Sequence, residues 1–270
     1  MKVSVFGLGY VGAVTSACLA QMGHKVIGID SKLEKNELIN SGKSPIYEPG
    51  LEKIISKQVS NGNLRAEDNL QTVINHTDLS LICVGTPSDS KGNLNLDFVT
   101  NVCKQIGEVI RKKDSFHTLV IRSTVLPGSI ENELIPVVES FSGKKNDIDF
   151  GFASNPEFMR ESSAIDDFYN PGRIIIGSSS ERVQNIANEI YNSTTNFICN
   201  SKIYNIGIRE AEMMKYVDNS FHALKVSFAN EVGSICNKLD IDSNVVMDLF
   251  SKDDKLNLSS YYLKPGFAFG

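Results

Sequence analysis

The chain has 270 residues, of which 41% are hydrophobic and 22% are charged, and its formal net charge is −5. This composition is typical of a globular protein with one large or two modest domains. Both charge signs are mixed along the chain without a basic block, which argues against a nucleic-acid partner. No apolar run approaches the ~18 residues of a membrane span and no signal segment is evident, so we expect a cytoplasmic protein without a membrane partner.

The first thirty residues predict a complete dinucleotide-binding unit. Residues 2–6 read as a short buried strand, and the sequence Gly-Leu-Gly-Tyr-Val-Gly follows at 7–12. A helical apolar pattern runs over 14–22, a second strand is expected at 25–29, and Asp30 stands at its end. A glycine-rich turn framed by strand, helix, strand and terminal acid is a specific signature, whereas the turn alone would be weak.

Each glycine of this turn has a separate task. Gly7 permits the tight turn, Gly9 lets the backbone approach a pyrophosphate, and Gly12 lets helix and strand pack closely. Tyr10 and Val11 open the helix, whose N-terminus supplies partial positive charge to the phosphates. All five residues are therefore expected to bind the cofactor.

The acid at the end of the second strand predicts which dinucleotide binds. Asp30 can accept hydrogen bonds from a ribose 2′-hydroxyl and would repel a 2′-phosphate, so NAD is favoured over NADP. Lys35, in an expected helix over 32–40, could reach the adenosine ribose; a solvated surface lysine is an equal alternative.

Further alternation of apolar runs and helical patterns predicts an α/β fold, a Rossmann-type doubly wound parallel sheet. Thr86 and Thr124 lie in loops that follow two of its strands, and such loops should face the cofactor. We expect a Rossmann domain over 1–203, followed over 204–270 by a long central helix and the start of a helical dimerisation domain. The expected strands are 64–66, 79–84, 118–122, 149–154, 173–177 and 197–199, and the expected helices are 32–40, 51–59, 96–110, 130–140, 182–191, 209–238 and 243–250.

The helix expected over 209–238 would be about 45 Å long at 1.5 Å per residue, more than one small domain needs. Lys215, Asn219 and His222 fall on one face of it, roughly opposite an apolar stripe. We therefore expect the stripe to be buried in a homodimer. Its members are Met213, Val217, Phe221, Leu224, Phe228, Ile235 and Leu239.

The last residues predict a chain that continues. An aromatic, glycine-bearing run over 255–270 with no element after it is a poor domain end, so we expect a part of a longer protein.

The cysteines have no metal-ligand spacing, their number is odd, and we expect buried thiols without metal or disulfide. They are Cys18, Cys83, Cys103, Cys199 and Cys236.

Five motifs together resemble the nucleotide-sugar 6-dehydrogenases, the UDP-glucose/GDP-mannose dehydrogenase family. They are Gly-Leu-Gly-Tyr-Val-Gly at 7–12, Val-Gly-Thr-Pro at 84–87, Arg-Ser-Thr-Val-Leu-Pro-Gly at 122–128, Asn-Pro-Glu-Phe-Met-Arg-Glu at 155–161 and Glu-Ala-Glu-Met-Met-Lys-Tyr-Val-Asp-Asn at 210–219. The resemblance spans the whole chain in order. The loop at 43–50 and the tail at 255–270 are most similar to members that act on GDP-mannose, although Lys264 and Ser260 depart from them.

The resemblance implies an enzyme that uses two NAD⁺ and a cysteine nucleophile to oxidise a sugar C6 alcohol to a carboxylate. GDP-mannose to GDP-mannuronate, a polysaccharide precursor, is the nearest reaction, and UDP-glucose is the alternative substrate. The family's cysteine would lie three residues beyond Gly270, so we expect the chain as given to be inactive. A non-catalytic NAD-binding and dimerising module remains a further alternative.

The resemblance also implies roles for residues of this chain. Thr124 would position the catalytic water, with Glu157 and Glu161 as its acidic partners, and Lys215 and Asn219 would stabilise oxyanion charge. From the residues alone, surface acids, a capping threonine and a solvated lysine are the favoured interpretations. The implied cofactor contacts include Thr86, Thr124 and Glu161, and the implied substrate contacts are Glu157, Phe158, Arg160, Lys215, Asn219, His222, Asn257, Tyr261 and Tyr262.

Overall fold

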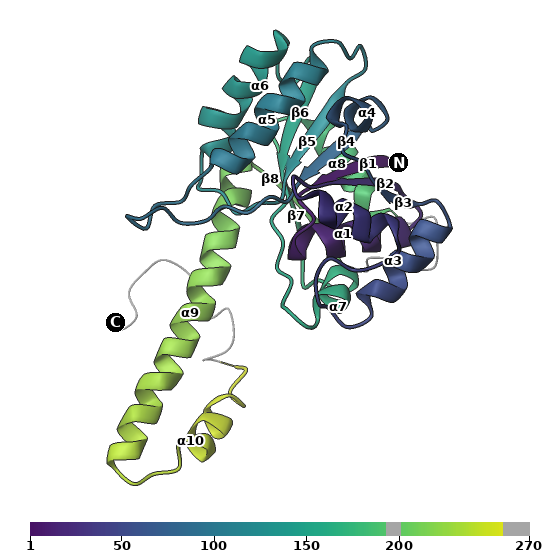
Figure 1. The fold of residues 1–270 in the computed structure, drawn as a ribbon. Helices are drawn as coiled ribbons and strands as arrows, with labels where there is room; N and C mark the ends of the chain where they lie inside the picture. Colours follow the sequence, from purple (N-terminus) through teal and green to yellow (C-terminus); the bar gives the residue numbers. More distant parts are fainter. Residues whose placement is uncertain (193–200, 256–270) are drawn as a thin grey trace. The chain divides into compact units, whose positions relative to one another are not determined.

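A computed structural model describes residues 1–192 and 201–255, and within them an eight-stranded sheet has the order β3-β2-β1-β4-β5-β6-β7-β8 (Figure 1). Neighbours from β3 through β6 pair in parallel, whereas β7 runs antiparallel to β6 and parallel to β8. The strands are β1 (Lys2–Phe6), β2 (Lys25–Ile29), β3 (Leu64–Ala66), β4 (Leu79–Ile82), β5 (His117–Ile121), β6 (Phe150–Ser154), β7 (Ile174–Gly177) and β8 (Ile203–Ile206).

Helices cover both faces of this sheet. On one face α1 packs against α3 and α7, and on the other α5 packs against α4 and α6. The helices of the first 192 residues are α1 (Tyr10–Gln21), α2 (Leu33–Asn40), α3 (Leu51–Ser60), α4 (Leu70–Asn75), α5 (Asp97–Ile110), the π-helical turn η1 (Ile130–Leu134), α6 (Ile135–Ser142), α7 (Ala164–Tyr169), α8 (Glu181–Asn188) and the 3-10 turn η2 (Glu189–Tyr191).

The central strands are buried on both faces, as a parallel sheet between two helical layers requires. All residues of β4 and β5 are buried, and their side chains alternate between two apolar cores. In β4, Leu79 and Leu81 join the core under α1, whereas Ile82 joins the core under α5. The carboxyl ends of β1, β4 and β5 therefore meet along one edge, where the predicted cofactor loops begin.

The structure confirms the predicted α/β fold class with its Rossmann-like sheet and long later helix. It differs in one respect, because β7 reverses direction. The chain returns from β6 through one short helix, α7, on the face that α1 covers, and pairs with β6 through Ser154 and Gly177. Neither α4 nor α7 was predicted, because six residues carry too little periodicity to be distinguished from a loop. The strand expected at 197–199 lies outside the described residues, and β8 forms just after them.

The chain divides into two compact units, residues 1–215 and 216–270. The helix α9 (Ile208–Lys238) is continuous across this division, and the described part of the second unit adds α10 (Ser243–Phe250). Asp242 caps α10 by accepting a hydrogen bond from the N–H of Asn244, and the rings of Phe228 and Phe250 lie 5.5 Å apart. Among the described residues no helix is both long and apolar enough to cross a membrane.

Candidate active site

The glycine turn at the end of β1 forms as the sequence predicts. Gly7 has a φ of +89°, and its N–H donates to Ile29 at 2.8 Å, which ties the turn to β2. A Cβ on Gly12 would lie only 1.7 Å from the carbonyl oxygen of Gly7, whereas a Cβ on Gly9 would meet no atom within 4 Å. Gly12 is therefore required for packing, and the space over Gly9 is free for a ligand.

The N-terminus of α1 is open to an anion. Gly9 has no side chain with which to cap the helix, and the first turn from Tyr10 contains no acid. The unpaired N–H groups and the helix dipole thus face the space above Gly9, which is the arrangement that binds a pyrophosphate.

Asp30 is anchored to this turn. Its Oδ2 accepts from the N–H of Leu8 at 2.7 Å and from the Lys35 ammonium at 3.2 Å, and its Oδ1 accepts from the N–H of Lys32 at 2.9 Å. Burial raises the pKa of Asp30, but these two N–H groups and Lys35 outweigh it and lower the pKa below its ordinary value. The carboxylate is therefore ionised at neutral pH, as the hydroxyl acceptor of a ribose must be.

A cavity of about 870 Å³ opens beside these residues. Gly7, Gly9, Asp30 and Lys35 line it, together with the start of the loop after β4. Its volume lies within the range that holds a dinucleotide portion, and the open backbone at Gly9 and the fixed Asp30 carboxylate fit the pyrophosphate and ribose of NAD.

The loops after β4 and β5 are joined where they border the sheet edge. Thr86 donates its hydroxyl to the carbonyl oxygen of Thr124 at 2.9 Å, and Ser123 donates to Val84 at 2.6 Å. The Thr124 hydroxyl itself makes no hydrogen bond with residues 1–192 or 201–255, so it is free to hold a water or a ligand. Glu212 of α9 supports this loop from behind, accepting from the N–H groups of Gly128 and Ile130 at 2.6 and 3.0 Å.

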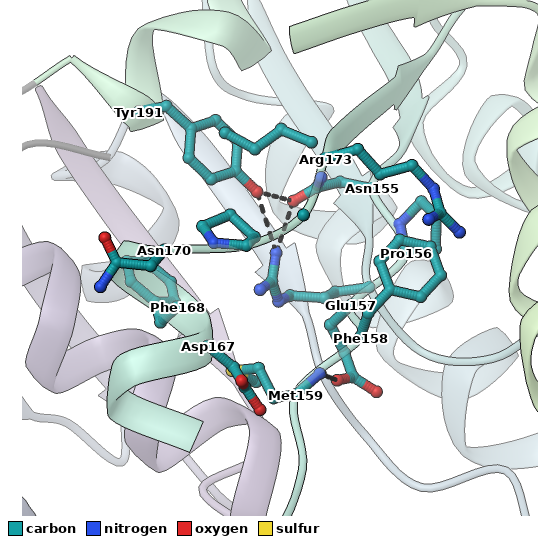
Figure 2. A pocket seen from close by; sticks show the side chains of 14 residues that line it. Asn155, Pro156, Glu157, Phe158, Met159, Asp167, Phe168, Asn170, Arg173 and Tyr191 are labelled. Carbon is teal, nitrogen blue, oxygen red and sulfur yellow. Dashed lines mark hydrogen bonds between the residues drawn. The ribbon is translucent and has the colours of Figure 1, made fainter. Parts of the chain in front are cut away.

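The loop that follows β6 is held by a buried polar cluster. The Arg122 guanidinium donates to Asn155 Oδ1 at 2.6 Å and to the Tyr191 hydroxyl at 3.1 Å, and Tyr191 donates to Asn155 at 2.7 Å. Asn155 also donates to the carbonyl oxygen of Ile175 at 2.8 Å, which joins the loop to β7. Figure 2 shows the bonds among Arg122, Asn155 and Tyr191 in a pocket of about 100 Å³, which Glu157 and Phe158 also line.

Glu157 and Lys215 form an ion pair at 2.8 Å, with side chains only 11% and 12% exposed. Lys215 also donates to the carbonyl oxygen of Glu157 at 2.6 Å, and its ammonium lies 5.6 Å from the centre of the Phe158 ring. The second carboxylate oxygen of Glu157 accepts from the N–H of Met159 at 2.7 Å. The predicted catalytic residues Glu157 and Lys215, 58 positions apart, are thus brought together.

The profile of the UDP-glucose/GDP-mannose dehydrogenase family, NAD binding domain, matches residues 1–195, and the profile of that family's central domain matches residues 209–270. The chain belongs to this family of NAD-dependent nucleotide-sugar dehydrogenases. Its cofactor is NAD.

Named relatives agree with this assignment. The GDP-mannose 6-dehydrogenase of Pseudomonas syringae pv. syringae is 48% identical over 270 residues, which cover 100% of this chain and 60% of the relative. The UDP-glucose 6-dehydrogenase of Bacillus subtilis (strain 168) is 37% identical over 272 residues and is covered over 58% of its length. The chain thus spans about 60% of the length of its curated relatives.

Solved structures of the family have the same fold. The crystal structure of a ternary complex of GDP-mannose dehydrogenase from Pseudomonas aeruginosa superposes with a TM-score of 0.96 at 47% identity, covering 100% of this chain and 61% of that chain. A UDP-glucose dehydrogenase from Pyrobaculum islandicum has a TM-score of 0.87 at 37% identity, covering 94% of this chain and 57% of that one.

The roles of the other residues expected at the dehydrogenase site stay predictions. Glu161 is exposed, and the Arg160 guanidinium pairs with Asp167 at 2.7 Å. Asn219 and His222 are exposed residues of α9 in the second unit. Asn257, Tyr261 and Tyr262 lie outside the described residues, so their substrate contacts remain predictions.

Sequence reasoning missed a clamp formed by Glu48, which is only 6% exposed. Its carboxylate accepts from the Tyr10 hydroxyl and from the N–H groups of Ser162 and Ala164, the last two at 2.9 and 3.0 Å. Burial, together with the Glu48 hydrogen bond, raises the pKa of Tyr10 to about 12. The clamp joins the glycine turn to the segment after Glu161, and its one sequence signal was an acid between two prolines.

The cysteine side chains of the described residues lie within the fold, and Cys83 also borders the NAD cavity. Cys18, Cys83, Cys103 and Cys236 are buried, and burial raises the pKa of the Cys18 and Cys83 thiols to about 12. Burial therefore keeps the thiols of Cys18, Cys83 and Cys103 from being ready thiolates. Cys199 lies outside the described residues.

Proposed function

We propose that the chain is the N-terminal part of an enzyme that oxidises the C6 alcohol of GDP-mannose to the carboxylate of GDP-mannuronate. The observation that carries this proposal is the buried Glu157–Lys215 ion pair, with the Lys215 ammonium 5.6 Å from the centre of the Phe158 ring. Identity of 48% to a GDP-mannose 6-dehydrogenase, against 37% to a UDP-glucose 6-dehydrogenase, favours the mannose nucleotide.

Bound NAD⁺ supplies the hydride acceptor for each of the two oxidations. The protein's own task is to hold charge and protons around the sugar C6. Lys215 offers a positive charge, fixed by two hydrogen bonds to Glu157, to the oxygen that becomes negative when the alcohol is oxidised. The free Thr124 hydroxyl and the Glu157 carboxylate are the groups suited to orient the hydrolytic water.

Alternative functions differ in substrate or in class. One is the same oxidation of UDP-glucose, and the other is a non-catalytic NAD-binding and dimerising module. We expect the 270-residue chain to bind NAD⁺ but to produce no sugar acid, because the described cysteines are buried and their thiols are not available to hold the aldehyde.

The test incubates the purified chain with NAD⁺ and GDP-mannose, and separately with UDP-glucose, and follows NADH absorbance. The proposal is supported if this chain forms no NADH and a longer form that reaches the full length of its relatives does. The sugar that the longer form oxidises identifies the substrate. Steady production of the acid by the 270 residues alone would place the nucleophile elsewhere. A full-length form that binds NAD⁺ and oxidises neither sugar would favour the binding module.

A further inference from the structure

A second carboxylate lines the NAD cavity, one strand beyond Asp30. Asp68 follows β3, is exposed, and borders the same cavity of about 870 Å³. The sequence offered no motif that distinguishes it from an ordinary loop acid, and the dinucleotide fingerprint does not include it.

A buried asparagine, Asn36, connects Asp68 to Asp30 by hydrogen bonds. Asn36 is 2% exposed; its Oδ1 accepts from the N–H of Asp30 at 3.0 Å, and its Nδ2 donates to the carbonyl oxygen of Asp30 at 3.1 Å and to Asp68 Oδ1 at 2.6 Å. The other carboxylate oxygen, Asp68 Oδ2, makes no hydrogen bond with the residues that the structure describes. The carboxylate is thus positioned through one oxygen and free to accept through the other.

The place of Asp68 in the sheet decides which part of the cofactor it can meet. The pyrophosphate turn follows β1 and the ribose acceptor follows β2, and β3 lies one strand further out. A dinucleotide that extends from the turn past Asp30 brings its base to this end of the cavity.

Large apolar side chains also line the cavity. Leu33 and Phe98 are 57% and 58% exposed, and both line it together with Leu70 and Val102. Contact with the faces of an aromatic ring would cover them.

We propose that Asp68 recognises the exocyclic amino group of adenine and makes the site specific for an adenine dinucleotide. A carboxylate can only accept hydrogen bonds, and away from the ribose the amino group is the one hydrogen-bond donor that adenosine offers. A base with a 6-oxo group places an acceptor against the carboxylate and carries its donor on the neighbouring N1 instead, so the aligned hydrogen bond is lost. The proposal rests on NAD binding and is independent of the sugar oxidised.

The test compares NAD⁺ with its deamino form, nicotinamide hypoxanthine dinucleotide, in which a 6-oxo group replaces the amino group. Calorimetric titration of the 270-residue chain should show at least about tenfold tighter binding of NAD⁺. Asp68→Asn retains an oxygen that can accept from Asn36 and presents an N–H to a 6-oxo group. The affinities for NAD⁺ and for the deamino form should then differ by less than about threefold. Asp68→Ala should weaken the binding of NAD⁺ and leave the binding of the deamino form nearly unchanged.

Asp114→Asn is the matched control, since Asp114 is an exposed acid that precedes β5, at the opposite end of the strands from the cofactor. Thermal melting of each variant establishes that it is folded. Equal affinity of the unaltered chain for both dinucleotides would overturn the proposal. So would equal weakening of both by Asp68→Asn, because this is the result of a contact to the ribose. Neither outcome depends on turnover of a sugar nucleotide.

Discussion

At the scale of single residues, we expect Asp30 and Lys35 together to determine the choice between NAD and NADP. Lys35 pairs with Asp30 at 3.2 Å, so its charge is occupied while the carboxylate is present. In Asp30→Ala the repulsion of a 2′-phosphate is lost and Lys35 is released to bind it. We expect the NAD⁺ preference, measured by titration with both cofactors, to narrow at least about tenfold. The double variant Asp30→Ala/Lys35→Ala should not show the increased NADP⁺ affinity of Asp30→Ala. An unchanged ratio of NAD⁺ to NADP⁺ affinity in Asp30→Ala would contradict this role.

Two glycines of the same turn should respond oppositely to one added methyl group. Gly12→Ala forces a Cβ to within 1.7 Å of the Gly7 oxygen, so we expect it to lower the free energy of unfolding by more than about 2 kcal/mol. Gly9→Ala meets no protein atom within 4 Å, and its backbone angles suit alanine, so its stability should change by less than about 1 kcal/mol. The methyl group nevertheless occupies the pyrophosphate space, and NAD⁺ affinity should fall. Urea unfolding and NAD⁺ titration of both variants check the contrast, which normal NAD⁺ affinity in Gly9→Ala would refute.

At the scale of elements, a buried hydrogen-bond network joins the amino ends of β4 and β5, opposite the NAD edge. Lys113 donates to the carbonyl oxygens of Ile74 and Thr77 and to His117 Nδ1 at 2.9 Å, and His117 Nε2 bonds the Ser80 hydroxyl at 2.8 Å. Because the ammonium donates to Nδ1, the ring must carry its proton on Nε2. Burial first, and then the Lys113 charge, lower the pKa of His117 well below 6.5, and burial lowers the pKa of Lys113 to about 8.

This hydrogen-bond network makes the free energy of unfolding depend on pH in a defined direction. A histidine whose folded pKa is depressed is neutral in both states above the unfolded value of 6.5, and below it only the unfolded chain takes up the proton. The free energy of unfolding should therefore fall by about 1.4 kcal/mol per pH unit through His117 as the pH drops below 6.5. His117→Gln retains hydrogen-bonding groups without titrating, so denaturant unfolding between pH 7.5 and 5 should show a shallower decline. Parallel curves for the variant and the original would contradict the assignment.

At the scale of the whole molecule, the described part of α9 leaves its apolar stripe uncovered. Leu224 and Leu239 are 62% and 64% exposed, and Phe228 is 47% exposed. Apolar surface in a continuous stripe on a long helix indicates an interface. We expect a homodimer, and Leu224→Glu should shift its dissociation to higher protein concentration. Asn230→Glu, at an exposed position roughly opposite the stripe, should not. Light scattering over a concentration series checks this, and a monomeric mass at high concentration would count against it.

Local sequence alone determined the dinucleotide unit, most strands and helices, and the fold class. The glycine turn, buried strands and amphipathic helices depend on contacts between near neighbours, and these leave periodic patterns that are read without a structure. The same reasoning placed Asp30, Thr86 and Thr124 at the cofactor edge, because loops after parallel strands share one side of a sheet.

Only the tertiary structure decided which distant side chains meet. Lys215 reaches Glu157 across 58 residues, and Glu48 joins Tyr10 to the loop after Glu161. Asn36 presents Asp68 to the cofactor cavity. Such pairs leave no periodic signal, because their geometry follows from how whole elements pack and from the need of each buried polar group for a partner. The reversed strand β7 has the same origin: a strand's direction depends on the path of its connection, not on its own residues.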